Sequence, residues 1–331
     1  MSYQADKTKA DKKWKKFKGL VIGVVACLII ASIVFAAFFP PETWKYYVAL
    51  PDVSKRKEGE LRIHFLDVGQ GDSTIIELPD GKVMLLDGGN SNASKTILRY
   101  LNALDIDTID YLVISHADSD HCGGLDTVVK NKKIRTAYIP PTYPSVNTQY
   151  AELYSALMEE GCKIIPSSMK EALKDSESSY TLAFLYPYSE DVKEENWTAT
   201  DTNDSSSVLW LDYGGISALF AGDCSASIES ELIRRDKLGV FSTLGVELNN
   251  TEILKVSHHG SKDSTSLKFV QHLNVQTAMI SCGENNSYNH PSNEAIANLE
   301  SVKAKVFRTD KQGHLMVTIK EGGYTVIPYS D

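Results

Sequence analysis

Cysteine is scarce in this chain of 331 residues: there are five, and no two form a Cys-x-x-Cys pair. The spacing excludes the disulfide framework of a small secreted domain. We interpret Cys122 and Cys224 as small buried hydrophobic residues rather than metal ligands. No internal repeat is recognisable in the sequence, although a duplicated β-rich layout stays open.

An excess of basic residues is also absent. Lys and Arg number 34 against 43 Asp and Glu, which gives a formal net charge of −9. Residues 1–18 hold seven lysines and two aspartates, so residues 19–331 carry −14. An acidic body argues against strong non-specific binding to nucleic acid, which needs a basic face, but it does not exclude a local basic groove.

One long hydrophobic run is present, and the sequence has no second one. Residues 19–39 are uncharged and almost wholly apolar. At about 1.5 Å per residue, a helix of this length spans about 30 Å, the thickness of a bilayer core. Pro40 and Pro41 are expected to end the helix. The apolar part of a cleaved signal peptide is usually about 7–15 residues, so we favour an uncleaved anchor.

The residues beside this run predict its orientation. Lysines precede the span and none lie in it, which places the N-terminus in the cytoplasm and the rest of the chain outside. Aromatic residues suited to the outer interface follow: Trp44, Tyr46 and Tyr47. The expected organisation is a basic cytoplasmic tip at 1–18, a transmembrane anchor at 19–41, a linker at 42–60 and a folded domain at 61–331.

The folded domain alternates short apolar strands with helical segments. Residues 61–68, 73–78 and 83–87 read as strands, and residues 93–104 have apolar positions at helical spacing. A turn at Gly214-Gly215 predicts a β-hairpin. Strand pairs mixed with crossover helices indicate a layered α/β domain.

The most informative stretch, S-H-A-D-S-D-H-C-G-G at 115–124, follows a buried strand. It places His116, Asp118, Asp120 and His121 within six positions. Imidazole and carboxylate groups suit Zn²⁺ and neighbouring divalent metals. So much negative charge on one loop is rarely tolerated unless a cation neutralises it. This cluster is therefore interpreted as metal-binding.

Three further predicted strand ends carry residues of the same kind. Asp223 follows one, and the pair His258 and His259 follows another, and we expect metal ligands in both places. The sequence does not decide which of the two histidines faces the metal. Asp87 follows a third strand, where a supporting or turn carboxylate is at least as good an interpretation as a ligand.

Taken together, these motifs resemble the metallo-β-lactamase superfamily, and most of all the hydrolase domain of ComEC-type competence proteins. The resemblance is carried, in chain order, by F-L-D-V-G-Q-G-D-S (65–73), L-L-D-G-G (85–89), the 115–124 stretch, T-N-D-S-S-S-V-L (202–209), F-A-G-D (220–223), K-V-S-H-H-G-S (255–261) and Y-N-H-P-S (288–292). It implies an α/β fold, the αββα four-layer sandwich, with two mixed sheets face to face, helices outside and a metal site at one edge.

The resemblance also implies two divalent metal ions, zinc or manganese. His116 and Asp118 would hold the first ion, Asp120, His121 and the final histidine the second, and Asp223 would bridge them. The second histidine of the usual H-x-H-x-D-H motif is Asp118 here, and the usual separate histidine is missing. Oxygen ligands in their place favour harder metals at the first position. Residues expected to support the site are Asp67, Asp72, Asp87, Asn203, Asp204 and Ser261.

The implied function is a membrane-anchored extracellular hydrolase that cleaves phosphodiesters with a metal-activated water. Asp120 would orient the nucleophile, and His290 would donate a hydrogen bond or proton to the scissile group, unless it is an ordinary loop histidine. DNA or another phosphoester of the cell envelope is the expected substrate, and the bacterial cell membrane the expected location. The alternative is a non-catalytic binding or scaffold module that kept its metal for stability.

Overall fold

The computed structural model describes residues 2–38, 45–169, 179–189, 192 and 203–329, in two compact units, 1–49 and 50–331. The first unit contains helix α1 (Ser2–Phe38), of which Lys12–Phe35 is long and apolar enough to cross a membrane. The helix begins at Ser2, so the basic tip is helical as well. Pro40, Pro41 and Trp44 lie outside the described residues.

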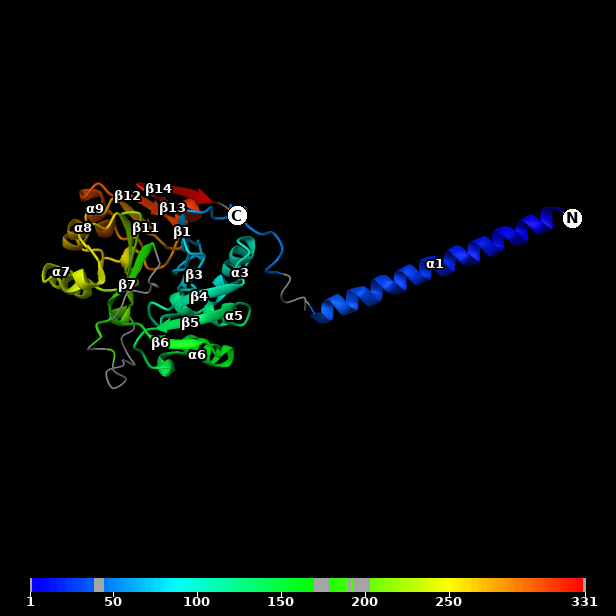
Figure 1. The fold of residues 1–331 in the computed structure, drawn as a ribbon, viewed down its shortest axis with the longest axis horizontal. Helices are drawn as coiled ribbons and strands as arrows, with labels where there is room; N and C mark the ends of the chain where they lie inside the picture. The colour runs from blue at the N-terminus through cyan, green and yellow to red at the C-terminus, as the bar shows by residue number, and fades with distance from the viewer. Residues whose placement is uncertain (1, 39–44, 170–178, 190–191, 193–202, 330–331) are drawn as a thin grey trace. The chain divides into compact units, whose positions relative to one another are not determined.

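The second unit contains two β-sheets (Figure 1). The larger one has eight strands in the order β14-β13-β1-β2-β3-β4-β5-β6. Neighbours from β3 to β6 are parallel, and the other pairs are antiparallel. The strands are β1 (Leu61–Phe65), β2 (Thr74–Glu77), β3 (Val83–Leu86), β4 (Thr108–Val113), β5 (Lys133–Ile139), β6 (Lys163–Pro166), β13 (His314–Lys320) and β14 (Gly323–Tyr329).

The smaller sheet has six strands in the order β12-β11-β10-β9-β8-β7. Strands β9 to β12 are parallel, whereas β8 and β9 form the predicted antiparallel hairpin, with both Gly214 and Gly215 at positive φ. Such φ values suit the tight turn and favour glycine. The strands are β7 (Tyr180–Tyr186), β8 (Val208–Tyr213), β9 (Ile216–Phe220), β10 (Ile253–Lys255), β11 (Thr277–Ile280) and β12 (Lys305–Arg308).

Helices cover the outer face of each sheet. Figure 1 shows α3, α5 and α6 on one side of the unit and α7, α8 and α9 on the other. One buried hydrophobic cluster joins side chains of both sheets, such as Phe65 and Phe220, and a second lies between the smaller sheet and its helices. The helices are α3 (Ser94–Ala103), α4 (Ser119–Cys122), α5 (Leu125–Val129), α6 (Thr148–Glu160), α7 (Ala226–Lys237), α8 (Leu267–Leu273), α9 (Asn293–Ser301) and α10 (Thr309–Gln312).

These layers confirm the predicted αββα arrangement of mixed sheets and helices. The topology also has a consequence for the site. Because β3 and β4 are parallel, as are β9 and β10, the carboxyl ends of each pair lie at one edge of their sheet. Binding sites in α/β folds are commonly built at such edges.

Candidate metal centre

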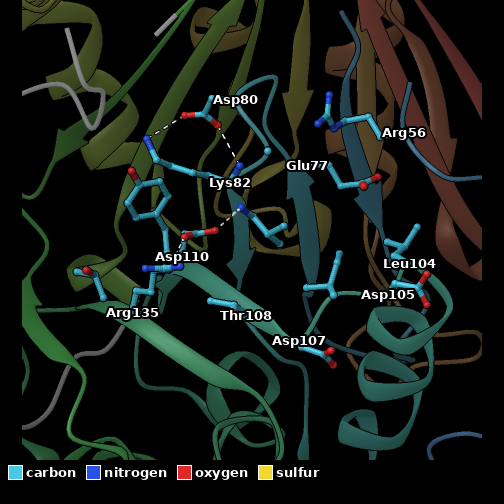
Figure 2. A pocket seen from close by; sticks show the side chains of 15 residues that line it. Arg56, Glu77, Asp80, Lys82, Leu104, Asp105, Asp107, Thr108, Asp110 and Arg135 are labelled. Atoms are coloured by element: carbon cyan, nitrogen blue, oxygen red, sulfur yellow. Dashed lines mark hydrogen bonds and ion pairs between the residues drawn. The ribbon is translucent and has the colours of Figure 1, made fainter. Parts of the chain in front are cut away.

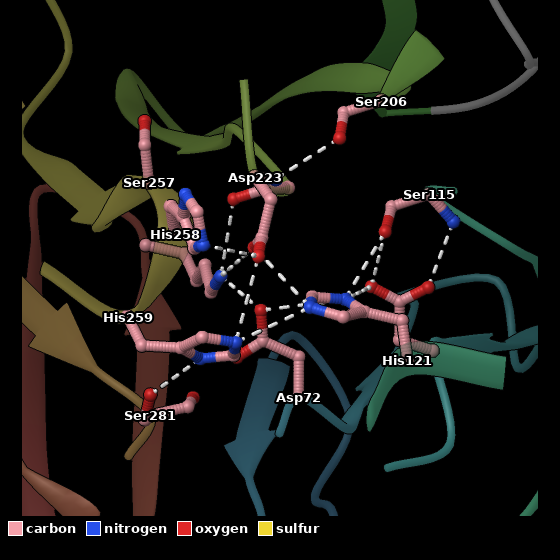
Figure 3. Close-up of polar contacts among 12 residues, drawn as sticks. Asp72, Ser115, His121, Ser206, Asp223, Ser257, His258, His259 and Ser281 are labelled. Atoms are coloured by element: carbon pink, nitrogen blue, oxygen red, sulfur yellow. Dashed lines mark hydrogen bonds and ion pairs between the residues drawn. The ribbon is translucent and has the colours of Figure 1, made fainter. Parts of the chain in front are cut away.

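The structure brings the predicted strand ends together (Figure 3). Asp87 follows β3, His116 follows β4, Asp223 follows β9, and His258 and His259 follow β10. His121 comes from the short helix α4, one turn after His116. Side chains from distant parts of the chain therefore converge on one place between the two sheets' edges.

Four buried residues form what we call the inner group: Asp72, His121, Asp223 and His259. One ligand atom from each lies within 4.8 Å of all the others. The Nε2 atoms of His121 and His259 are 3.3 Å apart, and His121 Nε2 is 3.2 Å from Asp223 Oδ1. Asp120 borders this group, with Oδ2 3.3 Å from His259 Nε2. Imidazole nitrogens and carboxylate oxygens aimed at a common point match the donors that Zn²⁺ and Mn²⁺ take.

A second set, the outer group, lies on the other side of Asp223 and consists of His116, Asp118 and His258. His116 Nε2 is 3.7 Å from Asp118 Oδ2 and 4.0 Å from Asp223 Oδ2. His258 Nε2 is 3.6 Å from the same Asp223 oxygen. His116 Nε2 is fully buried and has no hydrogen-bond partner among the described residues, which is costly unless another species satisfies it. The donors fit two divalent ions that share Asp223.

His258 and His259 both lie close to Asp223, so both of them are candidate metal ligands. His259 Nε2 and His258 Nε2 each lie 3.6 Å from Asp223 Oδ2. Both residues have φ in the left-handed region, at 52° and 47°, which is uncommon outside glycine. His259 Nδ1 donates to the Ser281 carbonyl at 2.8 Å, which leaves its Nε2 lone pair facing the inner group.

Asp87 supports the site from behind His121. Its Oδ2 lies 2.9 Å from His121 Nδ1, and it accepts hydrogen bonds from the backbone N–H and hydroxyl of Ser115 at 2.7 and 2.6 Å. A carboxylate bound to Nδ1 fixes the ring and its tautomer, so that Nε2 is the free ligand atom. This is the supporting role considered for Asp87 from the sequence.

Replacing Asp87 with Asn should weaken metal binding without removing a ligand. The amide can present N–H to Nδ1 and so favour the wrong tautomer of His121, and losses of about 10- to 100-fold in metal affinity are typical of such changes. Isothermal titration with Zn²⁺ on the metal-free protein measures the effect. An affinity equal to that of the unchanged chain would contradict this role for Asp87.

Sequence reasoning placed Asp72 in a supporting position and did not single out Lys255. The Asp72 carboxylate instead belongs to the inner group, and Lys255 Nζ forms an ion pair with its Oδ2. Lys255 Nζ also donates to the Gly222 carbonyl at 3.3 Å and lies 4.0 Å from Asp223 Oδ1. Burial would lower the pKa of Lys255, but Asp72 and Asp223 raise it, so the ammonium is kept. The structure shows Lys255 on a wholly buried strand, where an unpaired lysine is rare.

Three of the other predicted supporting residues make local hydrogen bonds, two of them to backbone N–H groups and one to a hydroxyl. Asp67 Oδ1 accepts from Gly69 N–H, Asp204 Oδ1 accepts from the Ser225 hydroxyl, and Ser261 Oγ accepts from Asp263 N–H. Asn203 Oδ1 is buried and has no partner among the described residues. The His290 ring lies at the rim, 5.4 Å from the His258 ring and 6.2 Å from the His259 ring. Cys122 and Cys224 are buried, and burial raises the pKa of Cys122 to about 12, which opposes a thiolate ligand.

Crowded carboxylates set the charge of the histidines. Burial would lower the pKa of His121, but Asp223 and Asp87 outweigh it and raise the pKa well above its ordinary value. Asp223 and Asp72 likewise raise the pKa of His259 against the effect of burial. Burial would raise the pKa of Asp223, yet the histidine charges hold it well below its usual range. Without metal, the neighbouring carboxylates therefore favour the protonated form of both imidazoles.

Metal binding should consequently release protons and weaken as the pH falls. Because their pKa values are raised, His121 and His259 keep their protons to higher pH than an ordinary imidazole does, and a metal must displace any proton that they carry. Each displaced proton makes the apparent affinity fall about tenfold per pH unit on the acid side. Titration calorimetry in buffers of different ionisation enthalpy counts the protons, and about one to two are expected. Metal affinity that does not change between pH 6 and 8 would contradict this prediction.

A cavity of about 830 Å³ lies elsewhere in the same unit (Figure 2). It is lined by residues at the start of β3 and β4, such as Val83 and Thr108, and so lies at the opposite end of these strands from the metal centre. Its charged groups are already paired: Lys82 with Asp80 at 2.9 Å and Arg135 with Asp110 at 2.8 Å. The convergent donors, not this cavity, mark the candidate site.

Comparison with known proteins agrees with this geometry. The profile of the Metallo-beta-lactamase superfamily matches residues 66–284, which include all members of both donor groups. ComE operon protein 3 of Bacillus subtilis (strain 168) is 31% identical over 293 residues, which cover 83% of this chain and 35% of that protein. Competence protein ComA of Neisseria gonorrhoeae is 30% identical over 268 residues, or 80% of this chain and 33% of that protein.

Solved structures were compared as well. The metallo-beta-lactamase fold protein YhfI from Bacillus subtilis aligns with 81% of this chain and all of its own length, at 13% identity and a TM-score of 0.48. The chain spans about a third of the length of the two competence proteins. The likeness to them therefore concerns one part of each.

Proposed function

Because the chain belongs to the metallo-beta-lactamase superfamily, whose members are mostly hydrolases, we propose that it is a metal-dependent phosphodiesterase. The observation that carries the proposal is the pair of donor groups that share Asp223. If both groups held a divalent ion, the two ions would suit an in-line displacement at phosphorus, because two metals can stabilise both the attacking and the leaving oxygen.

The site has one accessible side, from which a substrate would enter. The side chains of Asp118, Asp120 and His258 are 41%, 31% and 28% exposed, whereas those of His116, His121 and His259 are buried. Three aspartates belong to the two groups and Asp120 borders them, so the carboxylates at the centre equal its four imidazoles in number. Such a donor set suits Mn²⁺ as well as Zn²⁺ and is compatible with phosphoester chemistry.

The residues of the chain take separate roles in this reaction. When bound, the divalent ions would make a water molecule more acidic and offset the negative charge of the phosphodiester. Asp120 borders the inner group and is partly exposed, so its carboxylate is available to orient the attacking nucleophile. Burial, together with the nearby charges of His259 and His258, lowers the pKa of His290. A neutral His290 ring donates a hydrogen bond to the scissile group rather than serving as its acid.

The cellular setting is part of the same proposal. Helix α1 would anchor the chain in the cell membrane, with the lysines of residues 1–18 on the cytoplasmic side and the hydrolase domain outside. Its similarity to competence proteins supports DNA as the substrate, although another envelope phosphoester would fit the same chemistry. The proposal includes the linker at 42–60 and the hydrolase domain at 61–331 that the sequence predicts.

The test is a substrate panel on the full chain in detergent micelles. Single-stranded DNA, bis-p-nitrophenyl phosphate and a cephalosporin are each supplied with Mn²⁺ or Zn²⁺. We expect turnover of the two phosphodiesters, its loss with a chelator and no turnover of the cephalosporin. Absence of phosphodiester turnover with either metal would overturn the proposal, and full activity of Asp120→Ala would overturn the role given to that residue.

A further inference from the structure

One aromatic side chain stands exposed beside the metal centre. Tyr288 is 65% exposed, so most of its ring faces solvent. Its ring lies 5.7 Å from the His290 ring at an interplanar angle of 27°, and the His290 ring lies 6.2 Å from that of His259, again at 27°. Two successive ring contacts therefore connect the exposed Tyr288 with His259 of the inner group.

The loop that carries Tyr288 is held in place by its own hydrogen bonds. Asn286 Oδ1 accepts from the backbone N–H groups of Tyr288 and His290 at 3.2 and 3.0 Å. Asn286 Nδ2 donates to the carbonyls of Gly283 and His290 at 2.9 and 2.6 Å. A loop ordered before binding loses little conformational freedom when a ligand arrives.

The loop also packs closely against the centre itself. A Cβ built on Gly260, the residue after His259, would lie 2.6 Å from Pro291 Cβ. A Cβ on Gly283 would lie 2.6 Å from the backbone nitrogen of Gln70, in the loop that leads to Asp72. Tyr288 is therefore positioned by contacts to the same segments that supply His259 and Asp72.

We propose that Tyr288 is a stacking platform for a nucleobase of a single-stranded nucleic acid whose phosphodiester lies at the metal centre. The inference rests on the proposed phosphodiesterase function and names its substrate class. A phosphodiester alone offers no planar apolar surface, whereas the base beside it does. In a duplex, neighbouring bases cover both faces of each base, so a free face requires an unpaired strand.

The charge of the chain makes such a platform useful. Residues 19–331 carry a net charge of −14, which disfavours a general attraction for the phosphate backbone. Stacking on an aromatic ring does not depend on net charge and accepts every base. The substrate class is thus a single strand held by one or a few stacked bases, with weak dependence on sequence.

The test compares two oligodeoxynucleotides that differ only in whether the position next to the cleaved bond carries a base or is abasic. For the full chain in detergent with Mn²⁺, Tyr288→Ala should lower kcat/KM on the base-bearing strand about tenfold and leave the abasic strand unchanged. Tyr288→Phe keeps the ring and should stay within about twofold of the unchanged chain. Equal loss on both strands, or no loss on either, would overturn the inference.

A binding measurement keeps this inference separate from the catalytic one. A strand that carries 2-aminopurine should lose fluorescence when it stacks on the metal-free full chain, and Tyr288→Ala should abolish the quenching while Tyr288→Phe keeps it. Quenching without any phosphodiester turnover would support the stacking role of Tyr288 and overturn the proposed function. Turnover of single-stranded DNA with quenching that Tyr288→Ala does not change would overturn the platform alone.

Discussion

Replacing His121 with Ala is expected to lower phosphodiester turnover by roughly 10³-fold or more while the domain stays folded. His121 Nε2 is within 3.3 Å of both Asp223 and His259, so it is central to the inner group. Its loss removes a donor that no neighbour replaces and leaves a space lined with carboxylates. Turnover, metal content by mass spectrometry of the purified chain, and circular dichroism measure the three parts of this result.

His272→Ala is the matched control for this variant. Like His121, His272 is paired with a carboxylate, and its Nε2 lies 2.7 Å from Asp236 Oδ2. It is partly buried, belongs to α8 and is not part of either donor group. It should keep metal content and turnover close to those of the unchanged chain. If His121→Ala unfolds, the metal serves mainly to stabilise the domain, which is the scaffold alternative. If it keeps full metal content and turnover, the assignment of the centre is wrong.

Much of the fold and of the centre could be predicted because the signals are local. Continuous apolar runs mark strands such as β4 and β9, and a polar residue shortly after a buried strand, such as His116 or Asp223, is expected at a sheet edge. The ligand types within 116–121 are close in sequence and need only one turn of α4 to face the same way.

Sequence reasoning placed Asp72 in a supporting position and left open which of His258 and His259 faces the metal, and both points depend on features that no local pattern shows. Asp72 reaches the inner group because its loop packs against the backbone of Asp120: Gly71, with φ of 138°, leaves only 2.3 Å between a built Cβ and the Asp120 carbonyl oxygen. No local sequence pattern predicts this close contact between the Asp72 loop and the Asp120 backbone. The shared role of His258 and His259 depends on two adjacent left-handed residues, which spacing alone does not reveal.

Lys255 is an instance of the same limit. In the sequence it is one charged residue in E-I-L-K-V-S, compatible with a solvent-facing position on an alternating strand. The structure buries all three residues of β10, because sheet and helix cover both faces, and the ammonium is accommodated only by the carboxylates beside it. The charge on Asp72 and that on Lys255 are each tolerable because the other is present.

Lys255→Met should therefore destabilise the metal-free domain by about 3–5 kcal/mol, because it leaves the buried Asp72 carboxylate without its partner. Lys132→Met is the matched control: Lys132 is also buried, but its ion-pair partner Asp107, at 2.9 Å, is 90% exposed and stays solvated, and its other partner, Asn102 Oδ1 at 2.7 Å, is uncharged. We expect a clearly smaller loss there. Urea unfolding followed by circular dichroism compares the two free energies.

The same ion pair predicts two kinds of rescue. Adding Asp72→Asn to Lys255→Met removes the unpaired charge and should recover part of the lost stability, so that the two substitutions are not additive. Zn²⁺ should also stabilise Lys255→Met more than the unchanged chain, because a cation then satisfies Asp72 in place of the ammonium. Additive losses together with equal stabilisation by Zn²⁺ would mean that Lys255 and Asp72 act independently, contrary to the geometry of the inner group.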